Sequence, residues 1–283
     1  MSDDPFFNLS GPVKNFDAQM LAEALDISKH VCNVSYRPDI FNINKNRVEG
    51  VTFENVSFSK TEIKDITFKD CKFLDCLFIA TKFVDINVHS CSFRGCNFYK
   101  ASFKGMYGKP GQFSSAILSD RYANIAVHLY QELRDNYVDK VQPEFMREAE
   151  YQFNKWSHKL SWVEMRRARN FRTAGVLGWL GFGAYGVFFG FGLRLRNLAI
   201  TTLSSVLFLT ILAKTFAEGF FKEEGIVTWI RSMYFTVSTM ITLGAVGFTP
   251  KGDAGYIFLM LNAFVGVVLL SATLNAFSKR VSR

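Results

Sequence analysis

The sequence lacks the residue patterns that most enzymes use for catalysis. No Walker loop, catalytic triad or paired-carboxylate site occurs among its 283 residues, so we expect no enzymatic activity and no cofactor. Histidine is scarce, with 4 copies, and His89, His128 and His158 show no ligand spacing with one another or with cysteine. The 5 cysteines form no clustered pairs of the kind that bind zinc, so we expect no bound metal.

Charged residues also become scarce in the second half of the chain. They are frequent up to Arg172 and nearly absent after Asn197. The chain is 49% hydrophobic and carries a net charge of +8, part of it in basic clusters that flank the apolar runs. This distribution predicts a soluble half joined to a membrane half. The N-terminus has no basic segment followed by an apolar one, so we expect no cleaved signal peptide.

Two long apolar runs predict membrane-spanning helices at residues 198–216 and 254–277. At a rise of about 1.5 Å per residue, each can cross roughly 30 Å of hydrocarbon. Basic residues precede the first run and follow the second: Arg194, Arg196, Lys279, Arg280 and Arg283. By the positive-inside rule, both clusters should be cytoplasmic. The chain would then enter and leave on the same side, with both termini in the cytoplasm.

A third apolar run, residues 176–192, is ambiguous. It contains many glycines, and each weakens a helix by roughly 1 kcal/mol relative to alanine. Arginines lie on both sides of it, and the positive-inside rule does not allow both ends of a span to be inside. We therefore expect an interfacial or re-entrant helix within residues 173–196 and keep a true span as the alternative.

Between the two long runs, the sequence has the order of a pore loop. Residues 226–240 are compatible with a helix and carry Trp229, Tyr234 and Phe235. The negative C-terminal end of such a helix would point toward the membrane centre, which favours cations. Residues 242–247 would then return with their carbonyl groups toward the pore axis. The alternative is an amphipathic loop that only packs the two spans together.

From residue 197 onward, the sequence resembles the pore domain of two-transmembrane potassium channels, whose filter reads Thr-Val-Gly-Tyr-Gly-Asp and is followed by a proline. Without a gap, that filter falls on Thr242, Leu243, Gly244, Ala245, Val246 and Gly247. The resemblance also places Pro250 on the proline, Tyr234 and Phe235 on the aromatic pair that girdles the filter, and Gly266 on the gating glycine. It implies a homotetramer in the cell (inner) membrane that conducts monovalent cations.

Three departures from the family pattern concern selectivity. Val246 stands where the family has a left-handed glycine, a conformation that β-branched residues avoid. Ala245 lacks the tyrosine ring that braces the filter, and Ser238 replaces a frequent pore-helix acid. These changes predict a weakly selective cation channel. A potassium-selective channel with a variant filter and a membrane-anchored scaffold stay as alternatives.

The soluble half contains a five-residue repeat. Every fifth residue is bulky and apolar at Val48, Phe53, Phe58, Ile63, Phe68, Phe73, Phe78, Phe83, Val88, Phe93, Phe98 and Phe103. A smaller side chain lies two residues before most of these positions. A period of five fits neither a helix nor a simple strand and predicts a solenoid. The repeat lapses at residues 106–110 and is expected to resume at Phe113, Ala116 and Leu118.

This region, residues 41–119, resembles the pentapeptide-repeat family, which implies a right-handed quadrilateral β-helix with four repeats in each coil. Cys71 and Cys91 would stack on successive coils, as would Cys76 and Cys96, roughly 4.8 Å apart. A disulfide could bridge that distance, but the cytosol is reducing, so we interpret these cysteines as packing residues. The phenylalanines point inward, so we expect no nucleic-acid partner. A ligand or protein of unidentified chemistry could still bind the solenoid.

A helical hairpin is expected at residues 120–172, after the repeat. Tyr122, Ile125, Leu129 and Leu133 share one face of its first helix, and Pro143 suits the first turn of the second. The hairpin would either cap the open end of the solenoid or couple the solenoid to the pore. Residues 1–40 show no clear motif. The predicted fold is thus a membrane protein with a β-helix, a helical linker and an all-α pore domain at residues 197–283.

Overall fold

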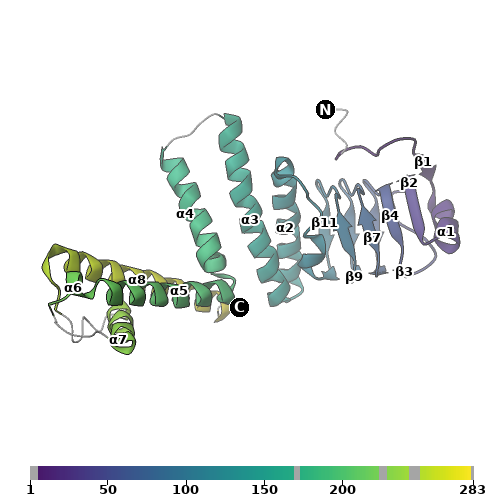
Figure 1. The fold of residues 1–283 in the computed structure, drawn as a ribbon. Helices are drawn as coiled ribbons and strands as arrows, with labels where there is room; N and C mark the ends of the chain where they lie inside the picture. Colours follow the sequence, from purple (N-terminus) through teal and green to yellow (C-terminus); the bar gives the residue numbers. More distant parts are fainter. Residues whose placement is uncertain (1–5, 169–172, 223–227, 242–248, 282–283) are drawn as a thin grey trace. The chain divides into compact units, whose positions relative to one another are not determined.

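The computed structural model describes residues 6–168, 173–222, 228–241 and 249–281 of the chain (Figure 1). It divides into two compact units, Met1–Trp179 and Leu180–Arg283. The first unit contains all of the named strands, and the second is helical in the part that the structure describes. The helix α4, Thr173–Phe189, contributes to both units.

The first unit is built on three sheets whose strands all pair in parallel, with strand orders β1-β2-β4-β7-β10, β11-β8-β5 and β12-β9-β6-β3. The strands are β1 (Lys14–Phe16), β2 (His30–Tyr36), β3 (Arg47–Glu49), β4 (Thr52–Ser57), β5 (Glu62–Lys64), β6 (Thr67–Lys69), β7 (Lys72–Leu74), β8 (Lys82–Val84), β9 (Asn87–His89), β10 (Ser92–Arg94), β11 (Ser102–Lys104) and β12 (Tyr107–Gly108). Phe73 pairs with Phe93 and Phe83 with Phe103, so one coil takes 20 residues. Parallel pairing at this offset agrees with the predicted solenoid.

Columns of stacked phenylalanine rings form the core of the solenoid. Phe53, Phe73, Phe93 and Phe113 follow one another with ring centroids 5.0, 4.7 and 4.6 Å apart. These distances are close to the spacing of neighbouring strands, because each ring lies over the same position of the previous coil. The bulky fifth residue of the repeat is therefore the core residue, and all four rings are buried.

The corners of the coils require the left-handed backbone conformation. Asn33, Asn55, Asp75 and Gly95 occupy one corner in successive coils, each with φ between 50° and 67°. Asparagine, aspartate and glycine tolerate this region better than other residues do. Side-chain identity at these corners is therefore set partly by the backbone, and the polar groups face outward.

The solenoid is longer than the five-residue repeat predicts. Residues 1–40, for which we found no motif, contain β1, the helix α1 (Ala18–Ile27) and β2, and β2 pairs with β4. The coil also continues through residues 106–110, where the five-residue pattern lapses, because Met106 is fully buried and Gly108 pairs with Val88. Leu118, expected to resume the core pattern, is instead 63% exposed.

A helical hairpin follows the short helices η1 (Pro110–Phe113) and η2 (Asp120–Tyr122). It consists of α2 (Ala123–Asp139) and α3 (Pro143–Ala168), and α3 begins at Pro143 as predicted. The Asn136 amide on α2 donates to the carbonyl of Met106 at 2.9 Å and accepts from its N–H at 2.8 Å. The Tyr137 hydroxyl donates to the carbonyl of Gly108. These bonds satisfy backbone groups at the end of the last coil, so α2 acts as a cap.

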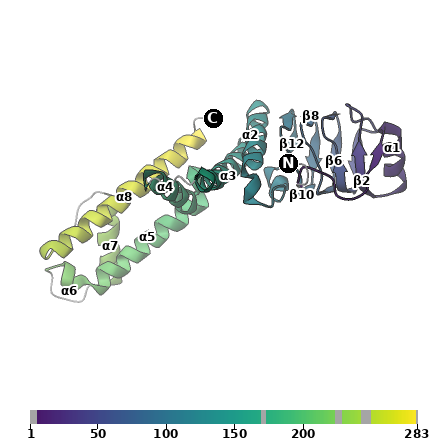
Figure 2. The same ribbon diagram turned by 90° about the horizontal axis from the view of Figure 1, so that it is seen from above.

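The second unit contains the end of α4, then η3 (Gly190–Gly192), α5 (Leu195–Thr215), α6 (Ala217–Phe220), α7 (Trp229–Met240) and α8 (Gly252–Val281). Figure 2 shows α5 and α8 side by side. Among the described residues, three segments are long and apolar enough to cross a membrane: Gly175–Gly192, Leu195–Thr215 and Gly252–Arg280. The two long runs of the sequence are thus helical, and α4 meets the same criterion of length and composition.

A tight reversal joins α4 to α5. Gly190, Phe191 and Gly192 all have positive φ. Side chains at the start of α5 hydrogen-bond the last carbonyls of α4: Asn197 donates to Val187 at 3.1 Å, and Thr201 donates to Phe188 at 2.6 Å. The carbonyls that a helix end leaves unpaired are thereby satisfied without water.

Candidate ion pore

The helix α7 packs against both α5 and α8. Its central side chain, Phe235, is fully buried, with its ring centroid 4.9 Å from that of Phe221 in an edge-to-face contact. At the N-terminal end, the Thr228 hydroxyl caps the helix by accepting from the N–H of Arg231. The Lys214 ammonium lies 4.0 Å from the centre of the Trp229 ring, a cation–π contact that ties α5 to the start of α7.

The residues predicted to form the filter, Thr242, Leu243, Gly244, Ala245, Val246 and Gly247, lie outside the described residues. The predicted pore loop comprises α7 and the predicted filter. Residues 220–222, which precede this loop, are hydrogen-bonded to residues 249–251, which follow it. The N–H of Lys222 donates to the carbonyl of Thr249 at 3.0 Å, and that of Lys251 donates to Phe220 at 2.8 Å. Phe221 and Pro250 form an antiparallel bridge, so the chain enters and leaves the loop at one place.

The C-terminal end of α7 lies directly against Gly266 on α8. A Cβ atom built on Gly266 would lie 2.5 Å from the Cα and 2.6 Å from the carbonyl carbon of Met240 and would overlap its carbonyl oxygen. The absence of a side chain at Gly266 therefore allows the two backbones to touch. The sequence predicts a gating hinge here, and α8 runs as one helix through this position.

The residues predicted to support the filter occupy different environments. Phe235 is fully buried, and Ser238, 2% exposed, donates its hydroxyl to the carbonyl of Phe235 at 3.0 Å. Tyr234 is 56% exposed and turns away from the interior of the chain. The structure therefore brings Phe235 and Ser238 into one packed core and leaves Tyr234 on the surface of the subunit.

Sequence reasoning missed a polar stripe inside this unit. The hydroxyls of Ser232, Thr236 and Thr239 recur along one side of α7, are buried, and have no hydrogen-bond partner in the part of the chain that the structure describes. The same holds for both amide atoms of Asn262 on α8, which is fully buried. Asn262 lies one helical turn before Gly266, so it belongs to the face of α8 that meets α7. The signal in the sequence was the i, i+4, i+7 spacing of Ser and Thr.

The outer faces of α5 and α8 carry large exposed apolar side chains. They are Ile200, Leu203, Leu207, Phe208, Tyr256, Ile257, Met260, Leu261, Phe264 and Leu270. A surface of this kind on two long helices is typical of contact with lipid or with another subunit. It agrees with a membrane setting for this unit.

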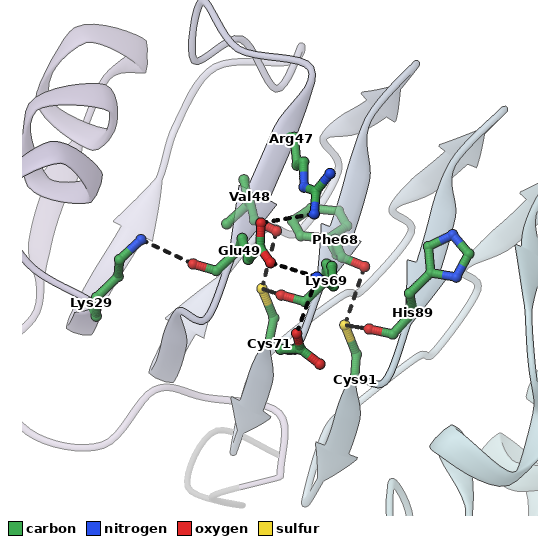
Figure 3. A network of polar contacts seen from close by, with 10 residues as sticks. Lys29, Arg47, Val48, Glu49, Phe68, Lys69, Cys71, His89 and Cys91 are labelled. Atoms are coloured by element: carbon green, nitrogen blue, oxygen red, sulfur yellow. Dashed lines mark hydrogen bonds and ion pairs between the residues drawn. The ribbon is translucent and has the colours of Figure 1, made fainter.

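Four cysteines of the solenoid are buried, and Cys32 is exposed. All 5 are free, and no cluster of metal-binding side chains occurs among the described residues. Cys71 and Cys91 lie on successive coils, and Figure 3 shows their sulfur atoms beside backbone carbonyls, at 3.3 Å from those of Lys69 and His89, respectively. A hydrogen bond from Cys91 lowers the pKa of Cys71, whereas the bond with Cys71 and burial raise the pKa of Cys91. Burial raises the pKa of Cys76.

Ion pairs link the coils on the outside beside these cysteines (Figure 3). Glu49 accepts from Lys69, one coil further on, at 2.7 Å and pairs with Arg47 at 2.8 Å. The hydrogen bond from Lys69 lowers the pKa of Glu49. Because all three side chains are about half exposed, these pairs are screened by water and contribute little to stability.

Comparison with known families agrees with this division of the chain. The family model for a pentapeptide repeat region matches residues 46–118, and the family model for an ion channel matches residues 199–283. The chain therefore joins a pentapeptide-repeat region to an ion-channel domain, as the two resemblances in the sequence predicted. Both families are non-enzymatic. Curated proteins and solved structures contain no match to the chain.

Proposed function

We propose that four copies of this chain surround one axis and form a weakly selective cation channel in the cell (inner) membrane. The observation that carries the proposal is the position of α7. This short capped helix lies between two apolar helices, and its C-terminal end abuts α8 at Gly266, all within the residues that match the ion-channel family. Purified protein in liposomes should conduct potassium and sodium. If no ion crosses, the membrane-anchored scaffold becomes the better description.

The tetramer follows from the single pore loop in each chain. One chain with one such loop cannot enclose a filter, and the family that the sequence resembles is tetrameric. The exposed apolar faces of α5 and α8 and the exposed ring of Tyr234 supply surfaces for neighbouring subunits. Mass measurement of the detergent-solubilised protein should give four chains. A stable monomer or dimer that still conducts would exclude this arrangement.

The preference for cations has two sources. Glu218 and Asp253 lie next to the loop that we assign to the outer side, and Glu223 and Glu224 follow shortly after Glu218 in the sequence. Negative charge at the mouth raises the local concentration of cations. The C-terminal end of α7 adds a partial negative charge that favours positive charge inside the pore. Reversal potentials under a potassium chloride gradient test this, and a chloride preference would refute it.

Weak selectivity among cations follows from the departures at residues 245–247. Selectivity depends on the number and arrangement of carbonyl ligands, and Val246 replaces the glycine that the family holds in a left-handed conformation. The triple variant Ala245→Tyr, Val246→Gly and Gly247→Asp restores the family pattern and should raise the potassium preference. Reversal potentials under potassium/sodium gradients measure it. A wild-type channel already strongly selective for potassium would remove Val246 from the explanation and favour the variant-filter alternative.

Both termini and the solenoid are assigned to the cytoplasm, and the repeat to the right-handed, four-sided course of its family. Cysteines introduced at Ser2 and Ser282, in a chain stripped of native cysteines, should both be protected from an impermeant reagent on intact cells. Both should react after the cells are opened. Labelling of only one terminus on intact cells would mean that α4 crosses the membrane.

A further inference from the structure

A cavity of about 630 Å³ lies on the outer surface of the solenoid, beside residues 6–10, here called the N-terminal segment. This volume is in the range of sites for small organic ligands, roughly 300–1,000 Å³. Its wall combines polar residues from β2, β4 and the corners between strands with apolar residues from the N-terminal segment and from residues 118–122. None of the lining residues is lysine or arginine.

The N-terminal segment is anchored at two points next to the cavity. At one, the Phe6 ring stacks on Tyr122 with centroids 4.1 Å apart, and the Phe6 carbonyl accepts from the buried amide of Asn97 at 2.7 Å. At the other, Asn55 donates to the carbonyl of Ser10 at 2.7 Å and accepts from its N–H at 2.9 Å. Both anchors are formed by specific side chains, so this wall of the cavity has a defined position.

Asp75, which lines the cavity, differs from the other aspartates at left-handed corners in its ion pairing. Four aspartates occupy left-handed corners of the solenoid, namely Asp65, Asp70, Asp75 and Asp85. Three of them have a lysine ammonium within 4 Å: Asp65 at 3.7 Å, Asp70 at 3.8 Å and Asp85 at 3.8 Å. Asp75 has no ion-pair partner within the described chain, and it borders the cavity.

The backbone around Asp75 makes room for its carboxylate. The side chain lies across Gly95 on the next coil, and a Cβ atom there would lie 3.3 Å from the Asp75 Cγ and would overlap its Oδ1. Asp85 lies across Gly105 in the same way, and there Lys140 of the capping helix supplies the cation. The same arrangement of an aspartate over a glycine thus occurs twice. Asp85 has its cation from Lys140 of the chain, whereas the carboxylate of Asp75 borders the cavity.

The rest of the wall defines the body of the ligand. A second carboxylate, Glu54, lines the cavity and is held by His30 with the imidazole Nε2 3.0 Å from its Oε2. Leu118 and Tyr122 supply apolar surface. The 63% exposure of Leu118 breaks the core pattern of the repeat and leaves its side chain free for a ligand.

We propose that this cavity binds a small organic cation, an amine carried on an aromatic or aliphatic body. The ammonium group would pair with Asp75, as Lys140 pairs with Asp85, and the body would pack on Leu118 and Tyr122. Because Asp75 is exposed, the affinity should be modest and weaken with salt. The inference does not depend on ion conduction.

The test uses tyramine and 4-ethylphenol, which differ only in the amine, and isothermal titration of the full chain in detergent. Tyramine should bind once per chain, and 4-ethylphenol about two- to fivefold more weakly, because an exposed ion pair is lost. Asp75→Asn should weaken tyramine to the same extent, and asparagine fits this corner, as Asn55 shows. The matched control is Asp65→Asn, a left-handed corner away from the cavity, which should leave binding unchanged.

A second variant separates the two halves of the site. Leu118→Ser should weaken both compounds, and because Leu118 is exposed the solenoid should keep its stability. Failure of tyramine to bind would overturn the proposal. So would equal affinities for the two compounds, or an equal loss in Asp65→Asn and Asp75→Asn, since either result would assign the binding to general charge or to apolar contact elsewhere.

Discussion

Replacing Gly266 with alanine tests the contact between α7 and α8. The added methyl group would meet the backbone of Met240, with 2.5 Å to its Cα and 2.6 Å to its carbonyl carbon. These atoms belong to the last turn of α7, and they cannot rotate away as a flexible side chain could. The two helices would have to separate at the end of α7 that precedes the predicted filter.

The size of the effect follows from two opposing terms. Alanine is favoured over glycine inside a helix by about 1 kcal/mol. Overpacking of a tight contact costs typically 1–3 kcal/mol. Because the contact is with backbone atoms, we expect the second term to exceed the first and Gly266→Ala to lose up to about 2 kcal/mol. The control is Gly219→Ala in α6, where nothing lies within 4 Å of the added atom. It should be neutral or stabilising.

The assay is thermal unfolding of both variants in detergent, together with flux in liposomes. Gly266→Ala should unfold at a lower temperature than the wild type and Gly219→Ala at the same or a higher one. Gly266→Ala should also alter flux, because the end of α7 moves. Equal stability of the two variants would refute the contact argument. Altered opening without any loss of stability would instead favour the hinge that the sequence predicts.

Three further predictions concern the first unit. In the native protein only Cys32 should react rapidly with a thiol reagent, and all five cysteines should react after unfolding. Rapid reaction of the four buried cysteines in the native protein would contradict the packing. Phe73→Ala should cost about 3–5 kcal/mol in urea unfolding, because its ring has stacked neighbours on both sides, whereas Tyr99→Ala, at a partly exposed site, should cost much less. Asn136→Leu should destabilise by at least about 1–3 kcal/mol by leaving the N–H and the carbonyl of Met106 unpaired, and an unchanged unfolding midpoint would exclude α2 as a cap.

The five-residue repeat predicts the core of the solenoid because bulky apolar side chains recur at the same position of each coil. The prediction fails where the spacing or the size of these side chains changes. The first coil pairs at an offset of 22 residues, as in the hydrogen bond between Asn33 and Asn55, so a search at a period of five does not reach β2. Gly108 occupies a core position without a side chain, which hides β12 in the sequence while the Tyr137 hydroxyl bonds its carbonyl.

The order of the helices α5, α7 and α8 was predictable from the sequence, but their packing was not. A helix was expected at residues 226–240. In the structure α7 begins at Trp229, because Thr228 is its N-terminal cap. The packing of Phe235 and the approach of Gly266 to Met240 depend on which faces of α7 and α8 meet, and a single sequence does not fix that. The buried amide of Asn262 was missed for the same reason. A single polar residue in an apolar run does not show whether its side chain faces the protein or its surroundings.

The placement of α4 decides on which side of the membrane the solenoid works. The C-terminal end of α4 is tied to the end of α8, because Asn275 donates to the Tyr185 hydroxyl at 2.9 Å and Lys279 to the Phe191 carbonyl at 3.1 Å. That end therefore lies with the basic residues assigned to the cytoplasm. The apolar stretch Gly175–Gly192 has 18 residues, within the range of about 17–25 that can span the hydrocarbon.

If α4 crossed, the arginines before it would have to stand outside, against the positive-inside rule, and the cavity at Asp75 would be open to an oxidising exterior. The four buried cysteines of the solenoid are free and tightly packed, which agrees better with the reducing side. Charge and cysteine chemistry thus favour an α4 that lies along the inner surface, and the length and hydropathy of α4 favour a crossing. On that basis an amine in the cytoplasm, rather than one outside the cell, is the ligand that the cavity would meet.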